Sequence, residues 1–279
     1  MADSSSDPGS DYFLGTSDHE FARLTLQQEV WGGVTDAFLD RLGLGPGACC
    51  LDAGCGPGLV TELLRERVGP TGHVRALDES PRWVEHLAAR ARAEGWTEVE
   101  PRRGRLQDVA LEGGSLDLVW LRWVLSFLPD PGALVARLAR ALAPGGVLAV
   151  MDYNHEGVSL FPESEGFRAA IRATRALYAR GGGDVWVGAR LPALFRAAGL
   201  ETFTLEPALL CGGPGSPAFR WADAFFPYHV DGMLEQGLLS AAERELFEAE
   251  WTARRADPDS LFFSPIVVCA AARQPASRA

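Results

Sequence analysis

The feature that most constrains the fold is a glycine-rich turn at residues 51–58, LDAGCGPG, between a strand-like run and a helix-like run. Glycines let a backbone turn tightly and approach a ligand where a β-carbon would collide. A dinucleotide-binding fingerprint, G-x-G-x-x-G, would need glycine at the position of Leu59. The acidic Asp52 precedes Gly54 and suits a cationic amino group better than a pyrophosphate. The turn therefore predicts a ligand with an amino-acid end.

Apolar strand-like runs alternate with helical stretches from residue 48 onward, which predicts an α/β fold with a parallel sheet wrapped by helices. Glycine and proline mark several of the boundaries. The predicted strands are 48–53, 73–77, 98–101, 116–121, 147–152, 201–205 and 262–271. The predicted helices are 60–68, 81–92, 132–142 and 191–198.

Two long stretches interrupt this alternation, at about residues 155–188 and 212–259. Both exceed the usual connections of about 2 to 6 residues in such folds. Insertions of this length usually cover the ligand crevice at the carboxyl ends of the strands. We interpret them as lid insertions, with a dimer surface as the alternative.

The motif D-x-G-C-G-x-G after a strand resembles the first motif of class I S-adenosylmethionine-dependent methyltransferases. Further segments resemble the same core, so that the resemblance covers about residues 48–152. It implies a Rossmann-like, mostly parallel seven-stranded sheet with helices on both faces. It also implies that Gly54, Cys55 and Gly56 line the methionine part of S-adenosyl-L-methionine, with Asp52 near its ammonium group directly or through water.

The second predicted strand ends near Asp78, at the distance where a ribose-binding carboxylate is expected in nucleotide folds. This position also fits the second motif of the resembled family. Asp78 is therefore the predicted ribose ligand, and Glu79 is a weaker neighbour. The alternative is that Asp78 only caps the helix that begins near Pro81.

The loop expected to read adenine departs from the G-D-x pattern of the resembled family, because residues 104–108 read GRLQD. Either Asp108 takes over through a shifted loop, or Leu106 and Gln107 hold the adenine while Arg105 faces elsewhere. Arg122 ends the fourth predicted strand. Its side chain is expected to contact either the cofactor or the loop that holds it, and the alternative is a solvated salt bridge.

The chain is divided into a flexible leader at residues 1–17, a cap helix at 18–46 and a methyltransferase domain at 47–279 with the two insertions. Apolar residues at helical spacing predict that the cap helix packs over the domain. The resemblance implies that such a helix closes over the cofactor. Tyr12, Arg23 or Gln28 would then reach the cofactor carboxylate or the acceptor.

A hydroxyl or protonated amine acceptor needs a base, and a histidine near a strand end suits that role. His155 follows the fifth strand and is the predicted base, and His229 is the second candidate. The neighbouring carboxylates do not give a usual metal-ligand spacing, so no metal is predicted. The predicted substrate contacts are Tyr12, Tyr153, Trp186 and Phe226, and ordinary lid packing explains the aromatic residues equally well.

The net charge of −11 and the pI of about 5.0 argue against a nucleic-acid partner. No apolar segment approaches the roughly 20 residues that span a bilayer. We therefore expect a cytoplasmic protein without membrane contact, either a monomer or a homodimer. The cysteines show no paired C-x-x-C spacing and are expected to be reduced.

The leading hypothesis is S-adenosylmethionine-dependent methyl transfer to a small-molecule acceptor at an O, N, C or S atom. One alternative is a nicotinamide-dependent oxidoreductase, which Leu59 disfavours. Another is a protein that binds S-adenosylmethionine without catalysis, suggested by Arg105 in the adenine loop.

Overall fold

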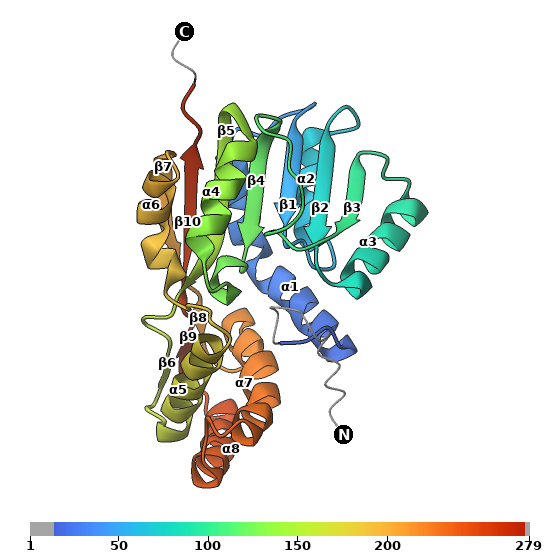
Figure 1. The fold of residues 1–279 in the computed structure, drawn as a ribbon. Helices are drawn as coiled ribbons and strands as arrows, with labels where there is room; N and C mark the ends of the chain where they lie inside the picture. Colours follow the sequence, from blue (N-terminus) through green and yellow to red (C-terminus); the bar gives the residue numbers. More distant parts are fainter. Residues whose placement is uncertain (1–13, 277–279) are drawn as a thin grey trace.

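A seven-stranded sheet forms the centre of the computed structural model, which describes residues 14–276 (Figure 1). The strand order is β3-β2-β1-β4-β5-β10-β7. The strands are β1 (Cys49–Ala53), β2 (His73–Asp78), β3 (Val99–Arg103), β4 (Leu116–Arg122), β5 (Leu142–Asn154), β7 (Glu201–Ala208) and β10 (Ile266–Arg273). Strands β1, β2, β3, β4 and β5 run parallel, whereas β10 pairs antiparallel with β5 and β7. The predicted α/β fold with a mostly parallel sheet is confirmed.

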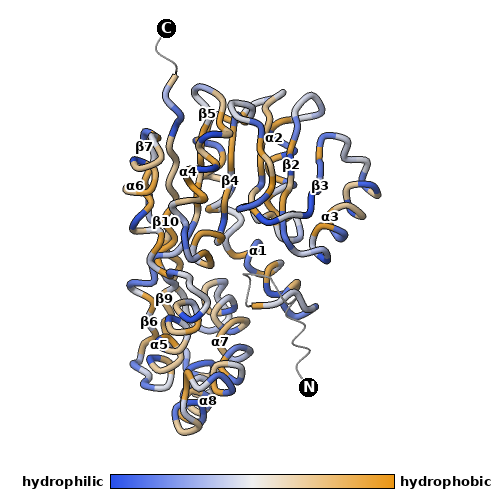
Figure 2. The backbone as a smooth tube through the Cα atoms, viewed as in Figure 1, coloured by the Kyte–Doolittle hydropathy of each residue, from blue (hydrophilic) through white to orange (hydrophobic). Residues whose placement is uncertain are grey.

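Helices cover both faces of the sheet, because successive side chains of a buried strand point to opposite sides. Trp120 of β4 joins the core on the face that carries Trp31 and Leu64, whereas Leu121 joins the core that carries Leu138. Figure 2 shows hydrophobic colour along these central strands. The helices around the sheet are α1 (Asp18–Asp40), α2 (Leu59–Val68), α3 (Pro81–Glu94), α4 (Pro131–Ala141) and α6 (Val187–Ala197), with a short 3-10 turn η1 (Leu125–Phe127) after β4.

Local sequence signals set several helix boundaries. The Ser80 side chain accepts a hydrogen bond from the Trp83 amide and caps α3, with Pro81 in the first turn. Asp130 caps α4 in the same way. Helix α6 begins at Val187, earlier than the predicted residue 191, and it tolerates Pro192 inside it.

The two insertions fold against each other beyond the carboxyl ends of the parallel strands (Figure 1). Their elements are β6 (Ser159–Phe161), α5 (Glu165–Arg180), β8 (Cys211–Gly212), α7 (Pro217–Glu235), α8 (Ala241–Ala256) and β9 (Leu261–Phe263). The short strands form a second sheet in the order β6-β9-β8. We call residues 155–186 and 211–264 the lid.

The predicted final strand at residues 262–271 is wrong in its extent, because it divides between two sheets. Its first residues belong to β9 and the rest to β10. Between them, the Ser264 amide donates to the Leu210 carbonyl at 2.9 Å, and Pro265 has no amide to donate to a ladder. The chain therefore leaves the lid sheet before it enters the main sheet.

No helix within residues 14–276 is both long enough and apolar enough to cross a bilayer. Tyr12 and most of the predicted leader lie outside the described residues.

The contact between α6 and β5 gives a stability prediction at Gly188. An added β-carbon would lie 2.7 Å from the Tyr153 carbonyl oxygen and 2.9 Å from that of Asp152. We expect Gly188→Ala to lower the free energy of unfolding by about 1–3 kcal/mol, because overpacking forces backbone shifts. Urea unfolding followed by circular dichroism measures the change.

Gly33 in α1 provides the matched control, since nothing lies within 4 Å of an added β-carbon there. Gly33→Ala should raise the free energy of unfolding by about 0.5–1 kcal/mol, because alanine loses less backbone entropy in a helix. Wild-type stability in Gly188→Ala would contradict the close packing of α6 on β5.

Candidate active site

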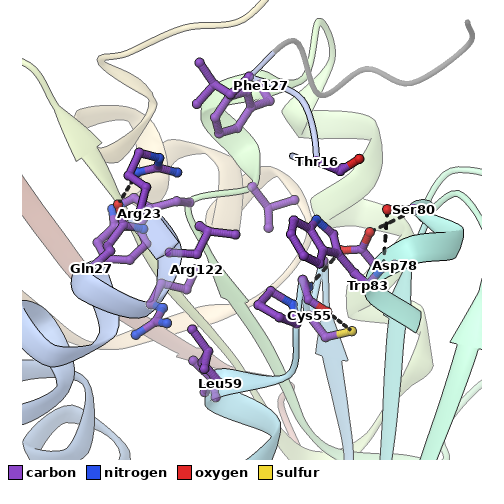
Figure 3. Close-up of a pocket in the computed structure, with 18 of the residues that line it drawn as sticks. Thr16, Arg23, Gln27, Cys55, Leu59, Asp78, Ser80, Trp83, Arg122 and Phe127 are labelled. Atoms are coloured by element: carbon purple, nitrogen blue, oxygen red, sulfur yellow. Dashed lines mark hydrogen bonds between the residues drawn. The ribbon is translucent and has the colours of Figure 1, made fainter. Parts of the chain in front are cut away.

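A pocket opens at the carboxyl ends of β1, β2, β4 and β5, between the sheet, α1 and the lid (Figure 3). Most of the residues predicted to bind the cofactor line it: Asp52, Gly54, Cys55, Gly56, Asp78, Glu79, Leu106, Gln107 and Arg122. We call this side the cofactor half. Asp108 does not line the pocket, and its side chain is 72% exposed beside Arg105. The structure therefore does not support the shifted-loop alternative for Asp108.

The glycines of the turn after β1 differ in what surrounds them. Gly54 has φ +74°, and an added β-carbon would lie 2.6 Å from Val124 Cγ2. Gly56 has φ +53°, with nothing within 4 Å of an added β-carbon. Gly58 has φ +85°, and an added β-carbon there would collide with Leu87 Cδ1. Packing therefore requires the outer two glycines, whereas Gly56 borders open space in a pocket that it lines.

Asp78 at the end of β2 holds the glycine turn in place. Its Oδ2 accepts a hydrogen bond from the Gly56 amide at 2.8 Å, and its Oδ1 accepts one from the Ser80 amide at 2.9 Å (Figure 3). Burial raises the pKa of Asp78 to about 6. The alternative that Asp78 caps α3 is wrong, because the Ser80 side chain provides that cap.

Asp52 on β1 is the second carboxylate of the pocket. Its Oδ2 accepts a hydrogen bond from Thr61 Oγ1 at 2.6 Å. Burial raises the pKa of Asp52 to about 6, while the Thr61 hydrogen bond and the positive charge of Arg122 oppose that rise. Two carboxylates at the ends of adjacent strands therefore face one pocket.

Arg122 at the end of β4 connects the sheet to α1. Its Nη1 donates hydrogen bonds to Gln28 Oε1 at 2.7 Å and to Thr35 Oγ1 at 3.0 Å. Its guanidinium carbon lies 4.9 Å from the centroid of the Trp123 ring. Burial lowers the pKa of Arg122 to about 10, which leaves it charged at neutral pH. The predicted solvated salt bridge is wrong, because the side chain is half-buried and these partners are neutral.

Arg23 on α1 forms a second polar cluster that reaches the lid. Its Nε and Nη2 donate to the two carboxylate oxygens of Glu20 at 2.7 and 2.6 Å, and its Nη1 donates to Gln27 Oε1 at 2.9 Å (Figure 3). The same Gln27 oxygen accepts a hydrogen bond from Trp221 Nε1 at 3.2 Å. One helix therefore contacts both the sheet and α7.

Aromatic side chains from β5, α5 and α7 line the other side of the pocket, which we call the acceptor half. It is lined by Tyr153, His155, Tyr178, Trp221, Phe225 and Phe226. Of the predicted substrate contacts, Tyr153 and Phe226 are at the pocket. Trp186 is not, and its Nε1 donates to Glu156 Oε1 at 2.9 Å instead.

The two candidate bases occupy different places. His155 lines the pocket and is 6% exposed, and its Nδ1 is buried without a hydrogen-bond partner in the described part of the chain. Burial, together with Arg175, lowers the pKa of His155 to about 3. His229 does not line the pocket, because it stacks on Phe225 with its Nδ1 2.8 Å from the Phe225 carbonyl oxygen. Burial lowers the pKa of His229 to about 4.

These pKa values bear on the prediction of a histidine base, which stays a prediction. Proton transfer is most efficient when the pKa of the base lies near the working pH. An imidazole with a pKa of about 3 is neutral at pH 7 and is a poor proton acceptor. His155 therefore lies at the predicted place in the pocket, but its pKa is lower than a general base needs.

Sequence reasoning missed four aromatic residues of the pocket: Trp83, Trp123, Phe127 and Tyr178. Trp83 lies in the first turn of α3, so its proximity to Asp78 in the sequence was an available signal. Trp123 has φ +54°, a left-handed conformation that is rare for a bulky residue and often found at functional sites. No sequence signal distinguished Tyr178 from the other aromatic residues of the lid.

Comparison with known proteins shows the family to which the chain belongs. Residues 51–150 match the methyltransferase domain family. The chain is 32% identical over 198 residues to trans-aconitate 2-methyltransferase from Deinococcus radiodurans, covering 67% of this chain and 74% of that protein. It is 38% identical over 118 residues to nocamycin O-methyltransferase from Saccharothrix syringae, covering 42% of each. The chain belongs to the class I S-adenosylmethionine-dependent methyltransferase family.

A solved structure agrees with the fold. Geranyl diphosphate C-methyltransferase from Streptomyces coelicolor A3(2) superposes with a TM-score of 0.57 at 16% identity, covering 87% of this chain and 76% of that one. This similarity shows the fold alone. Several curated relatives match over only part of their length, since the chain spans 48%, 42%, 54% and 44% of four of them.

The raised pKa of Asp52 gives a prediction for the ligand-free protein. A folded-state pKa of about 6, above the usual 3.8, contributes stability that is present below pH 3.8 and is lost as the pH rises through 6. We expect Asp52→Asn to remove this loss and to retain the Thr61 hydrogen bond. Between about pH 4 and pH 7, the variant should gain about 1–3 kcal/mol of unfolding free energy relative to wild type.

Denaturant unfolding of both proteins across this pH range measures the difference. His155 and His229 act with the opposite sign, because their lowered pKa values cost stability as the pH falls below 6.5. Both proteins contain them, so their effect cancels in the comparison. Parallel pH profiles of the two proteins would contradict the buried, raised-pKa carboxylate.

Proposed function

We propose that this protein transfers the methyl group of S-adenosyl-L-methionine to a small-molecule acceptor held under the lid. The observation that carries the proposal is the pairing of an open glycine turn with two carboxylates in one pocket, the buried Asp52 and the half-buried Asp78. Membership of the methyltransferase family supports the same conclusion and disfavours the nicotinamide alternative.

The cofactor half has the chemical groups that S-adenosylmethionine requires. Each carboxylate oxygen of Asp78 accepts one backbone hydrogen bond and keeps capacity for a ribose hydroxyl. Asp52 supplies a negative charge for the methionine ammonium group, directly or through water. The open space beside Gly56 lets the ligand approach the backbone of Cys55 and Gly56. Leu106 and Gln107 line the remaining wall, where we propose that adenine binds, with Glu79 close by.

S-adenosylmethionine supplies a sulfonium methyl group, which bonds to an acceptor lone pair while the electron pair of the broken carbon–sulfur bond returns to sulfur. The protein contributes position, because holding two reactants in line provides several kcal/mol of the barrier reduction. The aromatic acceptor half excludes water from the reacting atoms. We propose that His155, which is neutral, orients the acceptor by a hydrogen bond, and that a proton which the acceptor loses on methylation passes to solvent.

The relatives act on different acceptors, as their names state, so the atom that receives the methyl group is left open among O, N, C and S. The cytoplasmic location and the monomer or homodimer state stay predictions. The alternative of a non-catalytic binding protein also stays open to the same experiments.

Isothermal titration of purified protein with S-adenosylhomocysteine and with NADH tests the choice of cofactor. We expect saturable binding of S-adenosylhomocysteine with one site per chain and no measurable heat from NADH. Binding of NADH in place of S-adenosylhomocysteine would overturn the proposal.

The role of Asp78 gives a quantitative prediction. Asp78→Ala should weaken the binding of S-adenosylhomocysteine by about 1–3 kcal/mol, because charge-assisted ribose hydrogen bonds are lost and the Gly56 amide loses its acceptor. Isothermal titration measures the dissociation constant.

Asp117→Ala is the matched control for this substitution. Asp117 also accepts a backbone hydrogen bond next to β1, from the Cys49 amide at 2.8 Å, but it does not line the pocket. Its variant should keep the wild-type affinity. Equal affinities for all three proteins would remove Asp78 from the ribose site.

A further inference from the structure

We infer that the acceptor half of the pocket is built for an uncharged, planar ring compound with a polar edge, and that it excludes polycarboxylates. The inference rests on the proposed methyl transfer and narrows its substrate class. Three observations carry it: the aromatic wall from α7, the pairing of Arg23 with Glu20 and the buried polar groups of β5 and α5.

The aromatic wall comes from one helix, and neighbouring rings hold its side chains in place. Trp221, Phe225 and Phe226 of α7 are only 6%, 7% and 2% exposed, yet all three line the pocket. The Phe226 ring lies 5.0 Å from that of Phe167 in an edge-to-face contact, and Trp251 packs nearby at 6.2 Å. Rings fixed in this way offer flat apolar surfaces, which favour a planar ring by stacking or edge contacts.

The arginine of α1 beside the acceptor half is already paired with a carboxylate within the protein. Arg23 donates to both oxygens of Glu20 and to Gln27. Arg122 donates to Gln28 and Thr35 and shares the pocket with the Asp52 carboxylate. A polycarboxylate would lose its hydration here and would compete with Glu20 and Asp52 for the same cations, which makes its burial costly.

The polar groups of this half are neutral and suit a hydroxyl or carbonyl on the acceptor. Tyr153, His155 and Tyr178 all line the pocket. Burial raises the pKa of both tyrosines and lowers that of His155, so none carries charge at pH 7. Neutral phenol and imidazole groups donate and accept hydrogen bonds. They recognise a polar edge without requiring a charge on it.

This specificity would separate the chain from one class of its relatives. Trans-aconitate, which gives the Deinococcus radiodurans relative its name, is a trianion at neutral pH. The Arg23–Glu20 pair and the aromatic wall of this chain favour the opposite kind of acceptor. The lid therefore carries a different selectivity on a shared core.

Titration with three probes tests the inference: 2-naphthol, 2-naphthoate and trans-aconitate. The first two share one ring system and differ in charge at neutral pH, so they isolate the effect of a carboxylate. With S-adenosylhomocysteine present, we expect 2-naphthol to bind at least about 10-fold more tightly than 2-naphthoate. Trans-aconitate should give no measurable binding. Tighter binding of either carboxylate probe would overturn the inference.

A pair of variants tests the aromatic wall. Phe226→Leu keeps an apolar side chain but removes the ring, and it should weaken 2-naphthol binding by about 2- to 10-fold. Phe247→Leu is the matched control, because Phe247 is equally buried in the lid but does not line the pocket. An equal loss of affinity in both variants would contradict the role of the wall.

Two further measurements separate this inference from the proposed function. Both variants should keep the wild-type affinity for S-adenosylhomocysteine, which also shows that they are folded. The probe titrations are repeated without S-adenosylhomocysteine. Failure of the cofactor product to bind would contradict the proposed function, whereas the order of the three probes still decides the acceptor class.

Discussion

The hydrogen bond from the Gly56 amide to Asp78 is the interaction on which the site depends, because it connects the glycine turn after β1 to the end of β2. The two preceding amides, of Gly54 and Cys55, both donate to the Leu77 carbonyl, so the end of β2 holds three successive amides of the turn. Burial raises the pKa of the Asp78 carboxyl, which costs free energy in the ligand-free protein. A ligand that donates hydrogen bonds to the ionised form recovers part of that cost.

Helix α1 extends this arrangement from the sheet to the lid. On the sheet side it accepts hydrogen bonds from Arg122 through Gln28 and Thr35. On the lid side Gln27 accepts hydrogen bonds from both Arg23 and Trp221. The two halves of the pocket thus share one helix, so movement of α1 would affect the cofactor carboxylates and the aromatic wall together.

The sequence was sufficient to predict the core, because the alternation of apolar runs and the glycine turn are local signals. It placed Asp52 and Asp78 in one pocket because parallel strands end at the same edge of a sheet. It could not predict the lid sheet, which joins β6, β8 and β9 from distant segments. His155 shows the limit most clearly, since its position followed from the strand before it but its pKa depends on burial by other elements. The exposed side chain of Trp186 has the same explanation, because periodicity does not tell which aromatic residue of an insertion turns inward.

The cofactor half and the lid differ in whether they present charged groups to the pocket. The cofactor half keeps ionisable groups on strand ends, where backbone amides, Thr61 and an arginine partly offset their burial. The lid residues that line the pocket are neutral or apolar: His155, Thr174, Tyr178, Trp221, Phe225 and Phe226. A change of acceptor therefore requires substitutions in α5 and α7 and leaves the glycine turn untouched. Fold similarity at 16% identity accordingly carries no information on the acceptor, because the sheet is shared, whereas most residues of the acceptor half belong to the lid.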